Sequence, residues 1–489
     1  MTRIWKRVTA TVLLAALIGI AGCVTNPVTG KKEIMLIPES VEIEMGKSTD
    51  QAIQQEYGLY PDPALTAYVD RVARKMVPYT HRAKLPYHFA VLDTPIENAF
   101  AAPGGYVYVT RGLLAMMNSE AELATVLAHE LGHVNARHSA REMSRQLLIL
   151  GGIIVGSALS EDIQKIAPFL VVGMQVLFLK FSRSDEYQAD SLGVLYSRKA
   201  GYSPSLMVPF FQSIQKLEES AGGGIRLPNF LSTHPLTARR IEEVKKMLVP
   251  IDAEMDVIRD GFLRSVDGLT YGENPRQGFV EGSAFYCPDL QFAFNFPNGW
   301  TVQNTPQQVV VAPKDEKAAV ILTAEKTDKE ISAYHKEQLQ RFSDAQVSEI
   351  RTGGRRINGL TAFRGSYYVS PKPAEGQKVD EAKTNAVDVE CIRKDDHVFT
   401  FISLTSKGDY PNYEGAVDRT VQSFQRLTDP KALGVQPSKL RIRPVPRAET
   451  FREFLQENTV SDKRWKTLSF LNAIGLDAPL TQGQLVKIY

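Results

Sequence analysis

The sequence SEAELATVLAHELGH, residues 119–133, carries the pattern from which the fold is predicted. Ser119 followed by Glu122 three residues later is typical of a helix start. Apolar residues then recur at helical spacing: Leu123, Val126, Leu127 and Leu131. The sequence therefore predicts an amphipathic helix, on which residues four apart, such as His129 and His133, share a face.

This helix contains the pattern His-Glu-x-x-His. The imidazoles of His129 and His133 can hold one zinc ion, and Glu130 can take a proton from a zinc-bound water that attacks a carbonyl. A metzincin would need glycine at position 136 and histidine at position 139, where the chain has Ala136 and Ser139. The third ligand must therefore lie elsewhere.

His138 follows the motif one residue out of register. Helical phasing would turn its side chain away from His129 and His133. We therefore predict a surface or structural role for His138.

A second cluster, residues 185–190, reads DEYQAD. Glu186 and Asp190 are four residues apart, so one carboxylate can bind zinc while the other orients a ligand imidazole. A solvated charged helix face is the alternative interpretation of such a cluster. The upstream motif favours the metal site.

The motif Glu-x-x-Ala-Asp after His-Glu-x-x-His resembles the gluzincins that include CAAX prenyl endopeptidases, HtpX, mitochondrial Oma-type proteases and periplasmic BepA-like proteases. Further segments look like the bacterial lipoprotein branch: residues 26–30 (NPVTG), 98–100 (NAF), 103–105 (PGG), 137–138 (RH) and 232–237 (STHPLT). The resemblance covers roughly residues 23–250.

This resemblance implies a mainly α-helical minigluzincin core with a small β-sheet. One zinc ion would be held by His129, His133 and Glu186, with Glu130 as general base and acid and Asp190 supporting the ligands. His234 would donate to the oxyanion or occupy the open zinc position and silence the enzyme; a histidine that only caps a turn before Pro235 is the third alternative. Arg240 would assist the oxyanion.

The segment from Asn98 to Val109 predicts how a substrate is held. Asn98, Ala99 and Phe100 are the candidate substrate-binding residues, because an exposed strand edge binds an extended peptide by backbone hydrogen bonds. The alternative is that Tyr106–Val109 is an interior strand without a free edge.

The N-terminus combines three basic residues, Arg3, Lys6 and Arg7, with an apolar stretch from Val8 to Gly22. Residues 20–23 (IAGC) resemble a bacterial lipobox, so residues 1–22 are predicted to be a signal peptide and Cys23 to be lipidated. An uncleaved anchor is the alternative. Because Val24 follows the cysteine, the resemblance implies the outer membrane and a periplasm-facing protein.

The 489 residues are enough for two to four domains. A net charge of +2 gives no field to attract nucleic acid.

Two further cysteines, Cys287 and Cys391, are either bridged or separate buried thiols.

From about Phe279 the sequence changes to short β-like runs, which indicate a second domain. Residues 294–300 (FNFPNGW) and 357–360 (INGL) resemble a PsbP or Mog-type α/β sandwich, and residues 480–488 resemble the end of a LysM unit that would contact peptidoglycan. A small packing cap is the other role for this terminal module. The overall expectation is an α+β multidomain chain with these parts: signal peptide 1–22, lipidated tether and start of the mature chain 23–45, protease domain 46–250, linker 251–279, sandwich-like domain 280–428, and linker with LysM-like module 429–489.

The expected function is a zinc endopeptidase of the cell envelope that hydrolyses misfolded or stalled envelope proteins. The alternative is a lipoprotein scaffold or holdase with an idle zinc site. A scaffold that had lost catalysis would more often lack Glu130.

Overall fold

The computed structural model describes residues 23–146, 181–221, 230, 233–235, 237–372 and 381–489. The chain forms two units, one of residues up to Gly272 together with Ser438–Tyr489, and one of Glu273–Pro437. The terminal module thus belongs to the same unit as the helices of the predicted protease domain, and this division differs from the boundaries expected at residues 250 and 428. Within the described ranges, no helix combines the length and apolarity needed to span a membrane.

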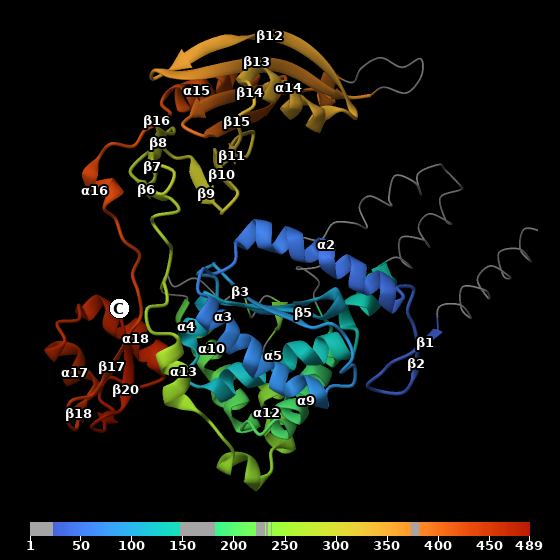
Figure 1. The fold of residues 1–489 in the computed structure, drawn as a ribbon, viewed down its shortest axis with the longest axis vertical. Helices are drawn as coiled ribbons and strands as arrows, with labels where there is room; N and C mark the ends of the chain where they lie inside the picture. Colours follow the sequence, from blue (N-terminus) through green and yellow to red (C-terminus); the bar gives the residue numbers. More distant parts are fainter. Residues whose placement is uncertain (1–22, 147–180, 222–229, 231–232, 236, 373–380) are drawn as a thin grey trace, which may run out of the picture. The chain divides into compact units, whose positions relative to one another are not determined.

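The first unit contains a three-stranded sheet with the strand order β3-β5-β4 (Figure 1). Strand β3 (His88–Leu92) runs parallel to β5 (Tyr106–Thr110), and β4 (Ala99–Ala102) runs antiparallel to β5. Strand β5 is therefore interior, and the edges of this sheet belong to β3 and β4.

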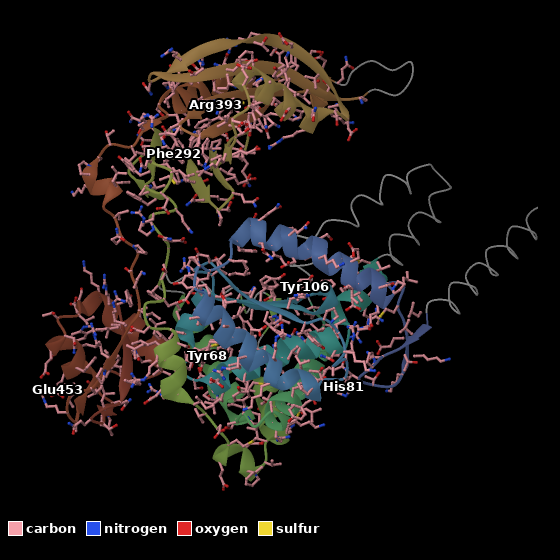
Figure 2. All side chains as sticks on the ribbon, in the orientation of Figure 1. Tyr68, His81, Tyr106, Phe292, Arg393 and Glu453 are labelled. Carbon is pink, nitrogen blue, oxygen red and sulfur yellow. The ribbon has the colours of Figure 1, made fainter. Side chains whose placement is uncertain are left out.

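Helices cover both faces of this sheet (Figure 1). Helix α2 (Glu39–Tyr57) shares one cluster with Tyr106, whereas α3 (Pro63–Met76) and α5 (Glu120–Asn135) share another with Val107. Neighbouring residues of β5 face opposite sides because side chains alternate along a strand. Figure 2 labels Tyr68 on α3 and Tyr106 on β5. The sheet is therefore the middle layer of a three-layer core.

The first unit contains further helices that pack around this core. The apolar runs Leu147–Leu159 and Ile166–Leu179 lie outside the described residues. The helices are α4 (Arg111–Met116), α9 (Arg183–Lys199), α10 (Met207–Ala221), α12 (Ala238–Met247) and α13 (Arg259–Ser265).

The segment expected to be a tether is docked on the first unit. Strands β1 (Cys23–Thr25) and β2 (Lys32–Ile34) form an antiparallel hairpin. Asn26 in its turn is fully buried, and its amide donates a 3.3 Å hydrogen bond to the carbonyl of Ala136 just beyond α5. The chain is therefore anchored to the end of the motif-bearing helix within a few residues of Cys23.

The C-terminal segment completes the same core. The side chain of Lys487 is fully buried, and its Nζ atom donates to the carbonyls of Ala115, Met117 and Leu471 at 2.9, 2.6 and 2.8 Å. Its elements are β17 (Arg441–Pro444), β18 (Glu449–Thr450), α17 (Phe451–Glu457), α18 (Trp465–Asn472), β19 (Pro479–Leu480) and β20 (Leu485–Ile488). Figure 2 labels Glu453 in α17, whose carboxylate accepts from the backbone N–H of Thr450 and so caps this helix.

The second unit is built on two antiparallel sheets, of order β12-β13-β14-β15-β11-β10-β9 and β16-β8-β7-β6. Cys287 and Cys391 are separate buried thiols in this unit, which is the second of the two expected alternatives. The strands are β6 (Phe279–Glu281), β7 (Ala284–Cys287), β8 (Phe292–Asn295), β9 (Thr301–Asn304), β10 (Gln308–Ala312), β11 (Ala318–Lys326), β12 (Ala345–Ile357), β13 (Leu360–Pro371), β14 (Asn385–Lys394), β15 (His397–Ser406) and β16 (Gln425–Arg426). The helices are α14 (Ile331–Gln338), α15 (Tyr410–Gln422) and α16 (Pro430–Leu433).

One buried histidine of the second unit predicts a pH-dependent stability. His335 on α14 is 1% exposed, and its Nε2 atom has no hydrogen-bond partner among the described residues. Burial lowers the pKa of His335, and the backbone at Val389 and the charge of Glu349 oppose this only weakly. The unfolded chain binds this proton near a pH of about 6.5 and the folded chain only at lower pH, so stability is complete above that pH and falls below it.

We expect the wild type to lose stability relative to His335→Phe as the pH falls from 7 to 5, by up to about 1.4 kcal/mol per pH unit. Thermal unfolding at several pH values measures this difference. A difference that stays constant over the range would contradict the prediction.

Candidate metal centre

Helix α5 places the first three site residues. Ser119 caps its start by accepting from the backbone N–H of Glu122 at 3.1 Å, as the sequence predicted. His129, Glu130 and His133 are each at most 2% exposed. The Nε2 atoms of the two histidines lie 3.1 Å apart. One turn of helix has therefore brought two potential ligand atoms to one point.

Helix α9 supplies the carboxylates and lies unusually close to α5. A Cβ atom on Gly132 would lie 3.0 Å from the backbone of Ala189, and one on Gly193 would lie 3.3 Å from the backbone nitrogen of His129. These glycines therefore permit a close approach of the two helices. Ser182 and Asp185 cap the start of α9 in a capping box, which fixes the turn that carries Glu186.

The donor atoms lie close enough together to contact one metal ion. Glu186 Oε2 lies 3.6 Å from Nε2 of His129, and Glu186 Oε1 lies 3.5 Å from Nε2 of His133. Zinc bonds of about 2.0–2.2 Å in a tetrahedron require donor separations of roughly 3.3–3.6 Å. The two separations from Glu186 agree with this range, whereas the 3.1 Å between the histidine nitrogens is shorter. The predicted ligands His129, His133 and Glu186 therefore have the chemistry and the proximity needed to hold one zinc ion.

His234 provides a fourth donor atom at the same centre. Its Nδ1 atom lies 3.4 Å from Nε2 of His129 and 3.2 Å from Oε1 of Glu186. Among the described residues, these four form a group that could hold a metal ion. His234 is 1% exposed, and its Nε2 atom lies 3.5 Å from Oε1 of Glu130.

Glu130 has the environment of a general base. Its side chain is fully buried, and both carboxylate oxygens have no hydrogen-bond partner among the described residues. Burial raises the pKa of Glu130, and the neighbouring His234 and His129 oppose this rise. The carboxylate is therefore free to exchange a proton with a substrate or a water molecule.

The ligands keep the protonation states that zinc requires. Burial lowers the pKa of His133 well below its usual value, so the imidazole is neutral. Burial raises the pKa of Glu186, but His234 and Arg240 outweigh it, so the net pKa is lowered and the group is a carboxylate. Neutral imidazole and charged carboxylate are the forms that bind metal.

Asp190 and Arg240 contact the side chains of the predicted ligands. Asp190 Oδ1 lies 2.9 Å from Nδ1 of His129, as expected for a residue that orients this ligand. Arg240 donates to both oxygens of Asp190 at 2.7 and 2.8 Å and lies 2.7 Å from Oε2 of Glu186. Arg240 thus holds the carboxylates from behind, whereas the sequence had suggested contact with the oxyanion.

His138 lies against the site, so the prediction that it turns away from His133 was wrong. Helix α5 ends at Asn135, and Arg137 adopts a left-handed conformation with φ of 55°. This turn brings Nδ1 of His138 to 2.8 Å from Nδ1 of His133. The prediction assumed that the helix continued; the helix ends three residues before His138, and this changes the phase.

The candidate substrate-binding residues lie at the start of the edge strand β4. Ala99 is fully buried toward α5, whereas Phe100 packs against Tyr108 on the opposite face, so its side chain points away from the zinc ligands. The Oδ1 atom of Asn98 accepts from the hydroxyl of Thr233 at 3.3 Å. The backbone N–H of Phe230 donates to the carbonyl of Glu97 at 2.9 Å. The segment that carries His234 is therefore attached next to this edge.

The family model of peptidase family M48 matches residues 63–248, which contain all the ligands and Arg240. Residues 63–248 match the M48 peptidase domain. The M48 family implies a metal ion, and the cluster of His129, His133, Glu186 and His234 could hold one.

Curated relatives of the M48 domain are proteases of bacteria and mitochondria. The beta-barrel assembly-enhancing protease of Escherichia coli (strain K12) is 29% identical over 212 residues, which are 42% of this chain and 43% of that protein. The mitochondrial metalloendopeptidase OMA1 of Schizosaccharomyces pombe is 29% identical over 226 residues, and that of Arabidopsis thaliana 33% over 208 residues. These matches cover 45% and 41% of this chain, and 65% and 40% of the two relatives. The chain thus spans less than two thirds of the length of each of these relatives.

Solved structures similar to part of the chain include two small proteins. The cyanobacterial PsbP of Synechocystis sp. PCC 6803 has a TM-score of 0.25 and 15% identity, and the match covers 30% of this chain and 94% of that one. The Ran-binding protein Mog1p of Saccharomyces cerevisiae has a TM-score of 0.23 and 13% identity. This match covers 30% of this chain and 97% of the Mog1p chain.

Proposed function

We propose that the chain is a zinc-dependent endopeptidase of the cell envelope that hydrolyses peptide bonds of misfolded or stalled envelope proteins. One observation carries the proposal: three potential metal-ligand side chains with donor atoms 3.1–3.6 Å apart lie beside a buried glutamate whose two oxygens have no hydrogen-bond partner in the described structure. A structural zinc site performs no proton transfer and therefore needs no carboxylate without hydrogen-bond partners beside the metal.

His129, His133 and Glu186 would hold the zinc ion. When bound, zinc polarises a carbonyl group and acidifies water, which makes peptide hydrolysis accessible near neutral pH. Asp190 keeps Nε2 of His129 directed to the centre, and Arg240 keeps Glu186 and Asp190 charged and in place.

Glu130 moves the proton. Its carboxylate takes a proton from the attacking water and delivers it to the leaving amine. The raised pKa of this buried group suits both steps, because a group that must accept and then release a proton works best with a pKa near the working pH.

The edge of β4 is the proposed substrate cleft. A peptide in extended conformation would add to this edge through backbone hydrogen bonds, and such binding selects for unfolded segments more than for particular side chains. Asn98, Ala99 and Phe100 would contribute mainly backbone atoms, because Phe100 faces α2 and the side chain of Asn98 contacts Thr233.

We propose that His234 occupies the open coordination position of the metal in the resting state. Catalytic zinc keeps one coordination position open, whereas four protein ligands are typical of structural sites. With Nδ1 of His234 beside His129 and Glu186, all four positions would be taken by protein. The segment of His234 would have to leave the edge of β4 before a substrate binds.

We expect His234→Ala to increase cleavage of an unfolded protein by about tenfold or more, which corresponds to removing about 1.4 kcal/mol of competing interaction. Initial rates of casein cleavage with equimolar zinc measure the effect. A lower rate would show that His234 assists catalysis, and an unchanged absence of cleavage would favour the scaffold function.

The place of action is proposed from the N-terminal sequence. Lipidated Cys23 would attach the chain to the membrane, in the outer membrane facing the periplasm, and the C-terminal module would add a contact with peptidoglycan. The enzyme named for β-barrel assembly in Escherichia coli gives the proposal its envelope context.

The test measures zinc content and cleavage of unfolded casein together. We expect one zinc ion per chain and cleavage that stops with a chelator and returns with zinc. His129→Ala and Glu186→Ala should each lose the zinc. If either variant kept a full equivalent, the proposed ligand set would be wrong.

A further inference from the structure

His138 is held rigidly behind a zinc ligand. Its side chain is completely buried, and the ring of Phe181 lies over His133 at 4.2 Å and near His138 at 5.8 Å. The left-handed Arg137 that precedes it donates to Oε2 of Glu42 at 2.8 Å and to the carbonyl of Ile37 at 2.7 Å. These contacts offset the strain of the turn, so the position of His138 is fixed by buried interactions.

The hydrogen bonds of His138 allow a single arrangement of protons that leaves His133 able to bind metal. Nε2 of His133 faces the zinc centre and must carry a lone pair, so the proton of the neutral ring is on Nδ1. That N–H points at Nδ1 of His138, 2.8 Å away, which must then accept. The proton of His138 is consequently on Nε2, where it donates to Oε1 of Gln188 at 3.0 Å.

Gln188 fixes this arrangement from the far end. It lies on α9 between Glu186 and Asp190, and its amide oxygen can only accept. A proton on Nδ1 of His138 would face the N–H of His133 and would force the proton of His133 onto Nε2, the atom required by zinc. The hydrogen bonds from His133 to His138 and from His138 to Gln188 therefore determine which nitrogen of His133 is available to bind zinc.

We propose that His138 is a positioning residue that holds His133 in the tautomer and orientation required for zinc, with Gln188 holding His138 in turn. The inference rests on the proposed zinc function and deepens it. The two ligand histidines thus have different supports, because His129 faces the carboxylate of Asp190 and His133 faces a neutral imidazole.

The experiment measures zinc affinity by competition with a chromogenic chelator, and the visible spectrum of the cobalt-substituted protein. His138→Phe keeps a ring beside Phe181 but offers no acceptor, and we expect zinc affinity to fall by about 10- to 100-fold. His138→Asn places an amide oxygen near the former Nδ1 atom, and we expect affinity within about threefold of wild type. The cobalt spectrum should change in His138→Phe and return toward wild type in His138→Asn.

Two further variants separate this role from packing. Gln188→Leu leaves His138 in place and should lower zinc affinity by about threefold or more, so the test does not depend on the folding of His138→Phe. His88→Phe removes an exposed histidine that stacks on Tyr106 and should bind zinc as the wild type does.

Wild-type zinc affinity in both His138→Phe and Gln188→Leu would overturn the inference and leave the proposed function intact. Equal loss in His138→Asn and His138→Phe would also overturn it, because the restored acceptor would then have no effect. A wild type that binds no zinc would overturn the proposed function and the inference together.

Discussion

Replacing Glu130 with glutamine should lower peptidase activity by about 10²- to 10⁴-fold while zinc stays bound. The amide has the size of the carboxylate but cannot take a proton from water. Because neither oxygen of Glu130 has a hydrogen-bond partner among the described residues, the exchange breaks no hydrogen bond and removes only the ion pair with His234 at 3.5 Å. The loss should therefore appear in the rate and leave the fold unchanged. Casein cleavage, zinc content and thermal unfolding of the same preparation measure the three quantities.

The comparison should be made in the wild type and in His234→Ala, so that a closed resting state does not hide the effect. Glu44→Gln, an exposed change of the same kind on α2, is the matched control and should retain full activity. Equal cleavage by wild type and Glu130→Gln would contradict the assigned proton transfer.

Replacing Lys487 with methionine should destabilise the first unit by about 3–5 kcal/mol. Burial lowers the pKa of this lysine, yet each of its three acceptors is a carbonyl oxygen, and only the ammonium form has three hydrogens to donate. The nearby carboxylate of Glu122 supports this charge. Methionine fills the space but leaves three buried carbonyls without this donor.

Chemical denaturation of the full chain, followed by the unfolding of the first unit, measures this change. Lys466→Met changes an exposed lysine of α18 in the same module, and we expect it to shift stability by less than about 0.5 kcal/mol. A loss in Lys487→Met no larger than in Lys466→Met would mean that the terminal module does not support the protease core.

The metal centre was predictable where its geometry is local. His129 and His133 share a helical face by spacing alone, and Glu186 and Asp190 do so on a second helix, so each pair needed only the periodicity of one element. The close approach of the two helices is also reflected in the sequence by Gly132 and Gly193, because a Cβ atom at either position would lie too close to the other helix. No spacing rule showed that these helices would meet; the resemblance to a family supplied that step.

The orientation of His138 and the carboxylate contacts of Arg240 were not predicted, because they depend on where a helix ends and on tertiary contacts. The phase of His138 changes at Arg137, whose left-handed conformation depends on Glu42, 95 residues away in the sequence. Arginine rarely adopts this conformation, so the local sequence gave no signal for the turn. Arg240 is recruited by Asp190 across 50 residues. The terminal module was separated from the protease domain for the same reason, because its contacts with α4 join distant parts of the chain.

The ammonium group of Lys487 also has a consequence for the order of events during synthesis. Residues 273–489, which include the whole second unit, leave the ribosome after the last residue of the M48 domain, and this takes about 10–40 s. Until Lys487 emerges, the carbonyls of Ala115 and Met117 near the start of the motif-bearing helix lack this donor. A nascent chain would thus contain all four residues of the candidate metal cluster well before this buried contact of the first unit can form.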